Sequence, residues 1–291
     1  VVQELSMECG IDPRTIDMNR TMTGKEVMSF LIPKGVHVHK RDRSDNQINV
    51  VDGKIAEDQG RLDKITLGSS ANGLIDRIWK DVGHKESVDF MTNIQRMVNR
   101  WLMDRGHSIG IEDVYISDEL RNIVDTIIDE NNQKISEILT QVEVYASVNN
   151  MSPDVIENLM TQMLTNVRSR IGNIIYKSLT DENQLKAMVK TGSRGDKNNI
   201  TQTIGALCGQ LVAGSRPGKT YNKRMLPFFT RHDDSPGARG FVKSSFFSGL
   251  DPIEFFAHCA GGRVGLVDTA RKTSKTGYSQ RKMIKAVEDE C

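Results

Sequence analysis

Near the C-terminal end of this sequence, small polar residues recur at the spacing of one helical face and are surrounded by cations. Thr269, Thr273 and Thr276 are four and three residues apart, which places their side chains on one side of a helix. Gly277 follows directly, where the missing Cβ would allow a close approach to the backbone. Residues 263–285 contain 7 basic residues and a single acidic one. Such a face suits a nucleic-acid backbone or a base pair, although a surface helix with solvated lysines is the alternative.

A second candidate is the segment 213–220, Ala-Gly-Ser-Arg-Pro-Gly-Lys-Thr. It matches a loose form of the Walker A loop that binds nucleotide phosphates, with Ala in place of the first Gly. Pro217 removes one of the backbone donors that such a loop needs. Pro227 would break the helix that has to follow it. A P-loop nucleotidase that depends on Lys219 is therefore the less favoured reading of this segment.

Two further candidates lie upstream. The loop of residues 192–197, Gly-Ser-Arg-Gly-Asp-Lys, would form an anion-binding nest of backbone amides, although a plain turn fits it equally well. His37 and His39 alternate along an expected strand and would share one face, a spacing that some metal sites use. Because the sequence offers no third ligand nearby, we favour a solvent-facing pair, and no metal site is expected.

The composition limits the class of protein. Of the 291 residues, 37% are hydrophobic and 26% are charged, which is typical of globular folding. Cys9, Cys208, Cys259 and Cys291 form no C-x-x-C pair, so we expect reduced thiols and neither a disulfide framework nor a zinc site. The sequence contains no apolar run of about 18 residues, so neither a membrane span nor secretion is expected. The chain begins with Val1 instead of Met, which suggests a fragment or a processed piece.

Charge is distributed unevenly, although the net charge is only +1. Residues 117–182 contain 11 acidic and 5 basic residues, whereas residues 190–243 contain 10 basic and 3 acidic ones. With the basic C-terminal segment, this predicts one acidic and two basic surfaces. Basic surfaces attract phosphates, although ordinary solvated charge would explain any single run equally well.

The first hundred residues predict strands and then a helix. Asp52-Gly53 favours a type I′ turn because both of its central positions take positive φ, so a hairpin is expected over residues 49–56. Residues 36–39 alternate like a strand. Residues 85–103 have the spacing of an amphipathic helix, which Gly106 is placed to end. The apolar stripe of this helix consists of Val88, Met91, Ile94, Val98, Trp101 and Leu102.

Two long helices are the clearest local structure. Ser117 is a suitable N-cap, and apolar residues then keep helical spacing almost to Val148. After a short turn at residues 149–151, Ser152-Pro153 supplies an N-cap and a proline at the first helical position. Each helix would cover about 25–30 residues. They predict a protruding antiparallel hairpin, although the same stripes would also fit a helical bundle.

A third long helix is expected at the C-terminus. Asp251-Pro252-Ile253-Glu254 is a capping box with proline at the first helical position, and the helical pattern continues toward Glu288. Glycines inside a helix cost about 1 kcal/mol each. Several of them in one helix predict either a bend or a close approach to its backbone. The glycines within this helix are Gly261, Gly262, Gly265 and Gly277.

Taken together, these segments resemble one protein family. Residues 237–258 are similar to the segment that leads into the bridge helix of RNA polymerase largest subunits, and residues 261–282 are similar to the bridge helix itself. Residues 188–202 resemble the loop and helix behind the funnel, and residues 23–29 and 68–75 resemble parts of the pore domain. The chain thus resembles the central part of the largest subunit of a multisubunit DNA-directed RNA polymerase, of the eukaryotic, archaeal or large-DNA-virus type.

The resemblance implies an α+β fold in three parts. Residues 1–115 would form a mixed β/α pore domain. Residues 116–240 would form a funnel domain built around the long antiparallel helical hairpin. Residues 241–291 would form the start of a cleft domain that contains the bridge helix.

The resemblance also implies roles for individual residues. Arg194 would reach the triphosphate of the incoming nucleotide. Val264 departs from the acidic or polar residue that most relatives have after Gly-Gly-Arg, which puts amatoxin sensitivity in doubt. The bridge-helix contacts at the active site would be Thr269, Thr273, Ser274, Thr276, Gly277 and Tyr278. The pocket between funnel and bridge helix, which amatoxins use in nuclear enzymes, would be lined by Asn199, Gln202, Gln210 and Gly262.

The implied activity is template-directed nucleotidyl transfer, with no catalytic residue in this segment. The family's Mg²⁺ is held by an Asn-Ala-Asp-Phe-Asp-Gly-Asp loop, and the sequence has no such run, so Mg²⁺ would be bound by other parts of the complete enzyme. The implied partners are the second-largest and smaller subunits, the DNA template and RNA–DNA hybrid, nucleoside triphosphates, and a transcript-cleavage or elongation factor at the funnel. The expected location is the nucleus or cytoplasm, or a virion or viral factory. An isolated funnel-type module that docks such factors is the alternative.

Overall fold

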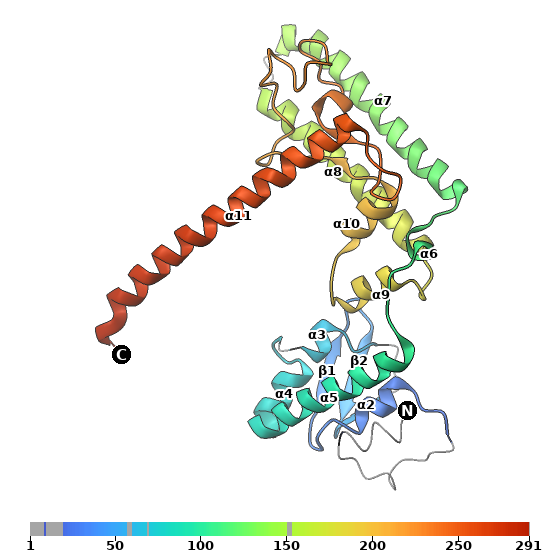
Figure 1. Cartoon of the computed structure of the whole chain (residues 1–291), viewed down its shortest axis with the longest axis vertical. Helices are drawn as coiled ribbons and strands as arrows, with labels where there is room; N and C mark the ends of the chain where they lie inside the picture. Colours follow the sequence, from blue (N-terminus) through green and yellow to red (C-terminus); the bar gives the residue numbers. More distant parts are fainter. Residues whose placement is uncertain (1–8, 10–19, 57–59, 69, 150–152, 291) are drawn as a thin grey trace. The chain divides into compact units, whose positions relative to one another are not determined.

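The computed structural model describes residue 9 and residues 20–56, 60–68, 70–149 and 153–290. The chain divides into two compact units (Figure 1). The first unit comprises Val1–Asp113 with Thr180–Asp196, and the second comprises Val114–Leu179 with Lys197–Cys291. We describe each unit by itself. The fold is mostly helical, with two small antiparallel sheets.

The sheet of the first unit contains β1 (Val38–Arg41), β2 (Gln47–Val51) and β3 (Lys54–Ile55) in that order. All pairs are antiparallel, with Val50 of β2 opposite both Val38 and Ile55. Asp52 and Gly53, between β2 and β3, have φ values of 49° and 75°, as a type I′ turn requires. The predicted hairpin is therefore confirmed.

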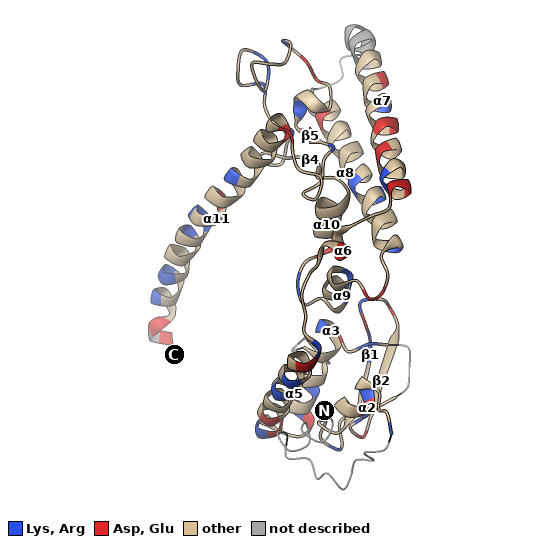
Figure 2. Ribbon diagram, turned by 45° about the vertical axis from the view of Figure 1, so that its right-hand side comes forward, with Lys and Arg blue, Asp and Glu red and all other residues tan. Residues whose placement is uncertain are grey.

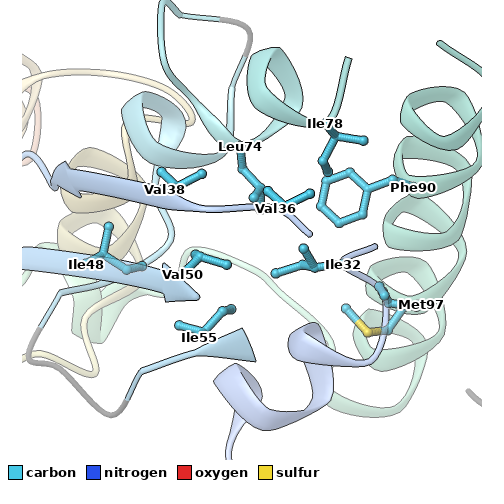
Figure 3. Packing of buried hydrophobic residues seen from close by; sticks show 11 residues of the cluster. Ile32, Val36, Val38, Ile48, Val50, Ile55, Leu74, Ile78, Phe90 and Met97 are labelled. Carbon is cyan, nitrogen blue, oxygen red and sulfur yellow. The ribbon is translucent and has the colours of Figure 1, made fainter. Parts of the chain in front are cut away.

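The core of the first unit lies between this sheet and two helices (Figure 3). Leu74 and Ile78 come from α4 (Leu74–Asp81), and Phe90 and Met97 come from α5 (His84–Arg105). The predicted end of α5 at Gly106 is confirmed, since this glycine has φ 72° and its amide bonds to Leu102 O. The short helices α2 (Gly24–Ser29) and α3 (Lys64–Leu67) flank the strands in sequence.

The apolar stripe predicted for α5 is mostly exposed. Phe90 and Met97 pack into the core, with Ile94 partly buried between them. Phe90, Ile94 and Met97 are four and three residues apart, so they share one edge of α5, which adjoins the predicted stripe. The apolar surface of α5 is therefore wider than the core of this unit can cover. The exposed members of the predicted stripe are Val88, Met91, Val98, Trp101 and Leu102.

A later segment of the chain completes the first unit. Helix α9 (Gln184–Thr191) begins at Asn183, whose side chain accepts a hydrogen bond from Lys186 N. It ends at Gly192, whose φ of 76° is left-handed. The Asn183 amide donates to Asp113 O at 2.8 Å, which joins α9 to the end of α6 (Ile111–Val114).

The second unit is built on a helical hairpin, as the sequence predicts. Its helices are α7 (Asp118–Asn149) and α8 (Pro153–Ser178). Arg170 of α8 pairs with Glu130 of α7 at 3.2 Å, and these residues are about equally far from the connection at residues 150–152, so the helices are antiparallel. Ser117 accepts from Leu120 N as the predicted N-cap. The predicted turn at 150–151 and cap at Ser152 lie outside the described residues.

The buried faces of the hairpin follow most of the predicted stripes. Two members of those stripes, Ile123 and Leu159, are nevertheless exposed. The buried hydrophobic residues of the hairpin are Val124, Ile127, Ile128, Ile135, Met160, Leu164, Val167, Ile171 and Ile175.

Beyond the hairpin the chain forms a series of short elements. α10 (Lys197–Ile200) continues into a π-helix, η2 (Thr201–Gly205), and then into β4 (Cys208–Gly209). A long irregular segment and the 3₁₀ turn η3 (Gly237–Arg239) lead to β5 (Phe241–Val242), which pairs antiparallel with β4.

The chain continues into α11 (Pro252–Val287), an unbroken helix of 36 residues, followed by the 3₁₀ turn η4 (Glu288–Glu290). The predicted capping box between Asp251 and Glu254 is present. Among the residues of α11, all of which the structure describes, only Ala257 is buried. In the described part of the chain, no helix is both long and apolar enough to cross a membrane.

Candidate nucleic-acid interface on the C-terminal helix

The small polar face predicted on α11 is present and exposed. Thr273 Oγ1 donates to Thr269 O at 2.7 Å, and Thr269 Oγ1 donates to Gly265 O at 2.9 Å. The hydroxyl protons are thus used within the helix, which leaves a compact surface on this side. All six residues predicted as active-site contacts lie on this exposed part of α11: Thr269, Thr273, Ser274, Thr276, Gly277 and Tyr278.

Cations surround this face along the helix (Figure 2). Lys282 lies 4.2 Å from the centroid of the Tyr278 ring, a cation–π contact that holds its charge beside the face. Lys272 donates to Asp268 at 2.8 Å, and this hydrogen bond and charge lower the pKa of the Asp268 carboxyl. Because the only acid within residues 263–285 is paired, the surface as a whole is cationic and suits a polyanion.

The first three turns of α11, residues 252–262, form its root and are held by several contacts. The Glu254 carboxylate accepts from Lys243 N at 3.0 Å and from Asp251 N at 3.2 Å. This one side chain therefore joins the end of β5 to the first turn of the helix. The Phe246 and His258 rings also pack edge to face, with centroids 5.4 Å apart.

Gln210, one of the predicted pocket residues, is buried and connects β4 to this root. Its amide nitrogen donates to Leu207 O and Cys208 O at 3.2 and 2.9 Å. Its oxygen lies 3.0 Å from His258 Nδ1. Because the amide nitrogen is already used, the oxygen is the acceptor, and the His258 proton is on Nδ1.

The π-helix holds the segment that precedes α11. A π-turn leaves backbone carbonyls available outside the normal helical ladder. Gln202 O accepts from Phe246 N, and Thr203 O accepts from Phe247 N, both at 3.0 Å. Arg168 of α8 donates to Leu207 O and Gly209 O, before and within β4, at 3.2 and 2.6 Å. The hairpin, the π-helix and the root of α11 are thus joined by hydrogen bonds.

The remaining predicted site residues lie on the surface. Asn199 and Gly262 are exposed, and Gln202 is half-buried in η2. Arg194 is exposed in the loop between Gly192 and Gly195, whose φ values of 76° and 74° are left-handed. Arg194 belongs to the first unit and the other four belong to the second.

The segment that resembles a Walker A loop does not form one. Lys219 Nζ is paired with Asp234 at 2.5 Å and also donates to His232 O at 3.2 Å. The chain continues into an isolated β-bridge between Tyr221 and Arg224, where a P-loop requires the N-terminus of a helix. The Lys219 ammonium group is thus already paired within the chain.

Lys219 belongs to an ion cluster that no local sequence pattern predicts; it is called the buried ion cluster because its members are between 3% and 35% exposed. Arg216 forms two bonds to the Glu157 carboxylate, at 2.9 and 2.8 Å, and its side chain is only 3% exposed. Arg239 contacts both Glu157 and Asp234. The five members of this buried ion cluster are Glu157, Arg216, Lys219, Asp234 and Arg239.

The cluster keeps both of its carboxyls charged. Burial by itself would raise the pKa of Glu157, but the hydrogen bonds and charge of Arg216, with Arg239, outweigh burial and lower it. For Asp234, burial is likewise outweighed by Lys219 and Arg239, so its pKa is also lowered. The cluster therefore fixes the segment 216–239 to the first turns of α8 by charge-assisted hydrogen bonds.

Among the residues that the structure describes, no group of three or more His, Cys, Asp or Glu is placed to hold a metal ion. His37 and His39 are both exposed, which confirms the solvent-facing pair. His39 Nδ1 lies 2.8 Å from the Asn49 side-chain oxygen. Burial raises the pKa of the Cys208 thiol to about 11, so this cysteine is a protonated core residue at neutral pH.

Comparison with protein families gives three consecutive matches. Residues 2–114 match RNA polymerase Rpb1, domain 3; residues 135–242 match domain 4; and residues 249–291 match domain 5. These matches define the chain as part of a multisubunit nucleotidyltransferase. The chain belongs to the Rpb1 family. It is a segment of the largest RNA polymerase subunit. The resemblance predicted from the sequence is thereby confirmed.

Proposed function

We propose that this segment supplies the bridge helix of the polymerase and lines the funnel and pore through which nucleotides reach the active site. The observation that carries the proposal is α11 itself. It is 36 residues long, is anchored only through its root within the described residues, and carries an exposed threonine face among cations. A helix with so little cover in its own chain requires other molecules around it. Template and product nucleic acid fit its charge and its small side chains.

In this proposal the threonine face lies against the base pair formed by the template and the growing RNA. Thr273 and Ser274 are its centre, with Thr269, Thr276 and Tyr278 beside them. Gly277 permits both a close approach and a bend. The helix alternates between straight and bent forms around residues 273–277 as the nucleic acid advances.

The other predicted roles belong to the same proposal. Arg194 contacts the triphosphate of the incoming nucleotide, and Asn199, Gln202, Gln210 and Gly262 line the pocket between funnel and bridge helix. The Mg²⁺ ion is held by aspartates of the complete enzyme. The partners are the other polymerase subunits, the template and hybrid, and nucleoside triphosphates. The proposal also includes the division of the chain into a pore part (1–115), a funnel part (116–240) and a cleft part (241–291).

The acidic face of α7 is the proposed docking surface for a cleavage or elongation factor. The sequence of this helix contains 7 acidic residues against Arg121 and Lys134, and Figure 2 shows the positions of acidic residues along its ribbon in red. Asp125 and Asp129 also line a cavity of about 410 Å³, which Lys243 lines as well. Such a face attracts a basic partner surface.

The test is single-nucleotide addition by the complete polymerase with Thr273→Trp, with Thr273→Ser as the matched control. The indole would fill the space proposed for the base pair. We expect the addition rate to fall more than about tenfold, which corresponds to about 1.4 kcal/mol in the barrier. Ser keeps the hydroxyl and the small volume, so its rate should remain near that of the unaltered enzyme. A wild-type rate for Thr273→Trp would mean that the helix has a purely structural role.

A further inference from the structure

A short loop in the second unit presents an aromatic ring almost entirely to solvent. The loop comprises residues 221–232 and is called the aromatic loop below. Phe228 near its middle is 80% exposed, the highest value among the large hydrophobic residues of the described chain. A phenylalanine held in solvent in this way has a large apolar area available for burial against a partner.

The aromatic loop is held in one conformation by its own backbone and one arginine. Tyr221 and Arg224 exchange two backbone hydrogen bonds of 3.0 and 3.1 Å, and His232 N donates to Lys223 O at 3.0 Å. The Arg224 guanidinium donates to Pro227 O and Phe229 O at 3.2 and 3.1 Å. These two carbonyls flank Phe228 on either side, so its backbone is fixed before any partner arrives.

The base of the aromatic loop is fixed as well. The segment before the loop is bound through Lys219, and the segment after it through Asp234, which pair with each other at 2.5 Å. Both residues belong to the buried ion cluster, which reaches α8 through Glu157. A rigid support of this kind lowers the ordering cost of binding, as an interface anchor requires.

The surface around Phe228 is basic. Lys223, Arg231 and His232 are exposed in the loop. The neighbouring Asp233 is half-buried, and its carboxylate accepts from Ser235 N at 2.9 Å. The loop thus combines one apolar anchor, Phe228, with two exposed cations, Lys223 and Arg231. The complementary surface is an apolar pocket with carboxylates around it.

We propose that Phe228 is an interface anchor that inserts into an apolar pocket, rimmed by acidic residues, on another protein subunit of the same polymerase. A rigid aromatic residue surrounded by weaker polar contacts is typical of the residues that dominate binding energy at interfaces. The proposal rests on membership of the chain in a multisubunit enzyme and is independent of the role proposed for α11.

Single-stranded nucleic acid is the less favoured occupant. Proteins that bind it stack successive bases on several aromatic rings along a cationic groove. In the aromatic loop, the Tyr221 ring lies 5.7 Å from the Arg224 guanidinium of its own chain. Phe229 is half-buried and lines a cavity of about 280 Å³. Tyr221 is 54% exposed and Phe228 80%, so the loop presents two exposed rings, of which Phe228 projects further, and this suits insertion into one pocket better than a row of bases.

The experiment uses the complete purified polymerase with a photoreactive benzophenone side chain at position 228. The matched control carries the same group at Lys54, which is exposed on the strand β3 of the first unit. We expect position 228 to crosslink to one protein subunit, at a site that contains apolar and acidic residues. Crosslinks to RNA or DNA, or a yield no higher than that of the Lys54 control, would overturn the proposal.

The charge argument is tested by a second substitution in the same enzyme. Arg231→Glu should reduce the crosslinking yield at position 228 by about threefold or more, since it places like charges across the rim. Lys54→Glu is the charge-matched control and should leave that yield unchanged. Because Arg231 is exposed, its reversal should not affect folding. An unchanged yield with Arg231→Glu would contradict the acidic rim.

Discussion

The two parts of α11 differ in how they are held. The root, residues 252–262, is bound by Glu254, His258 and the close approach of Gly261 to Leu211 O, which lies 3.0 Å from where a Cβ would be. For Gly262, Gly265 and Gly277, a Cβ would meet nothing within 4 Å in the described part of the chain. The root is thus held by contacts within this segment, whereas the remainder of the helix is exposed in the described part of the chain.

The charged residues of the second unit are also of two kinds. The charges of the buried ion cluster are paired, and their side chains are between 3% and 35% exposed. Those of the outer part of α11 are exposed and mostly of one sign. The first kind stabilises a conformation, and the second attracts a partner at a cost in self-repulsion. Substitutions in the two groups should therefore change different measurements.

The largest effect is expected from Glu157→Ala. This change leaves Arg216, which is 3% exposed, without its carboxylate, and an uncompensated buried charge is strongly destabilising. Because Glu157 itself is partly exposed, we expect a loss of about 2 kcal/mol, or about thirtyfold faster hydrogen exchange. The measurement is amide exchange of residues 215–240 in the complete enzyme.

The matched control for this substitution is Glu130→Ala. Glu130 pairs with Arg170, but both side chains are about half exposed, and such pairs contribute about 0–1 kcal/mol. Exchange in residues 215–240 should be unaffected by this change. If both variants accelerated exchange equally, the buried ion cluster would have no special part in fixing this segment.

The next largest effect is expected from reversing exposed acidic residues on the hairpin. Reversal of Asp125, Asp129 and Glu137 to Lys should weaken binding of a cleavage or elongation factor by about tenfold or more at low salt. The loss should shrink as salt screens the charges. Factor affinity would be measured at several ionic strengths. Affinity and salt dependence that both stayed unchanged would exclude docking on this face.

A smaller effect is expected from pH. The pKa values of Glu157 and Asp234 are lowered from 4.5 and 3.8 in the folded protein. The unfolded chain therefore binds protons first, and the stabilisation is complete above about pH 4.5 and is lost as pH falls through the folded values. After correction for the intrinsic pH dependence of amide exchange, exchange of residues 215–240 should accelerate below that pH. In Glu157→Gln the acceleration should be smaller, and an identical profile would contradict this assignment.

The sequence predicted the elements whose determinants are local. The turn at Asp52-Gly53, the stop at Gly106 and the capping box at Asp251 each depend on residues within one turn of each other. The long helices followed from their apolar stripes. The family could be recognised because the motifs of residues 237–282 are contiguous.

Contacts between distant residues could not be predicted in this way. Glu157 and Arg216 are 59 residues apart, and Gln210 and His258 are 48 apart, with no periodicity that relates them. The exposed stripe of α5 has the same cause, since periodicity identifies an apolar face but not which edge the core covers. The π-helix also lacks a local signal. The contacts of the predicted site residues with nucleic acid stay predictions.

The smallest effect is expected from a substitution in the outer part of α11, residues 263–287. Ala is better than Gly in a helix interior by about 1 kcal/mol, and position 277 has room for the added methyl group. If the helix alternates between straight and bent forms, Gly277→Ala should favour the straight form by about fivefold. The elongation rate of the complete polymerase should then change while its fold survives. Gly265→Ala is the matched control, because its Cβ is equally unobstructed but lies outside residues 273–277, where the bend is proposed. Equal rates for both variants and the unaltered enzyme would mean that bending at Gly277 takes no part in elongation.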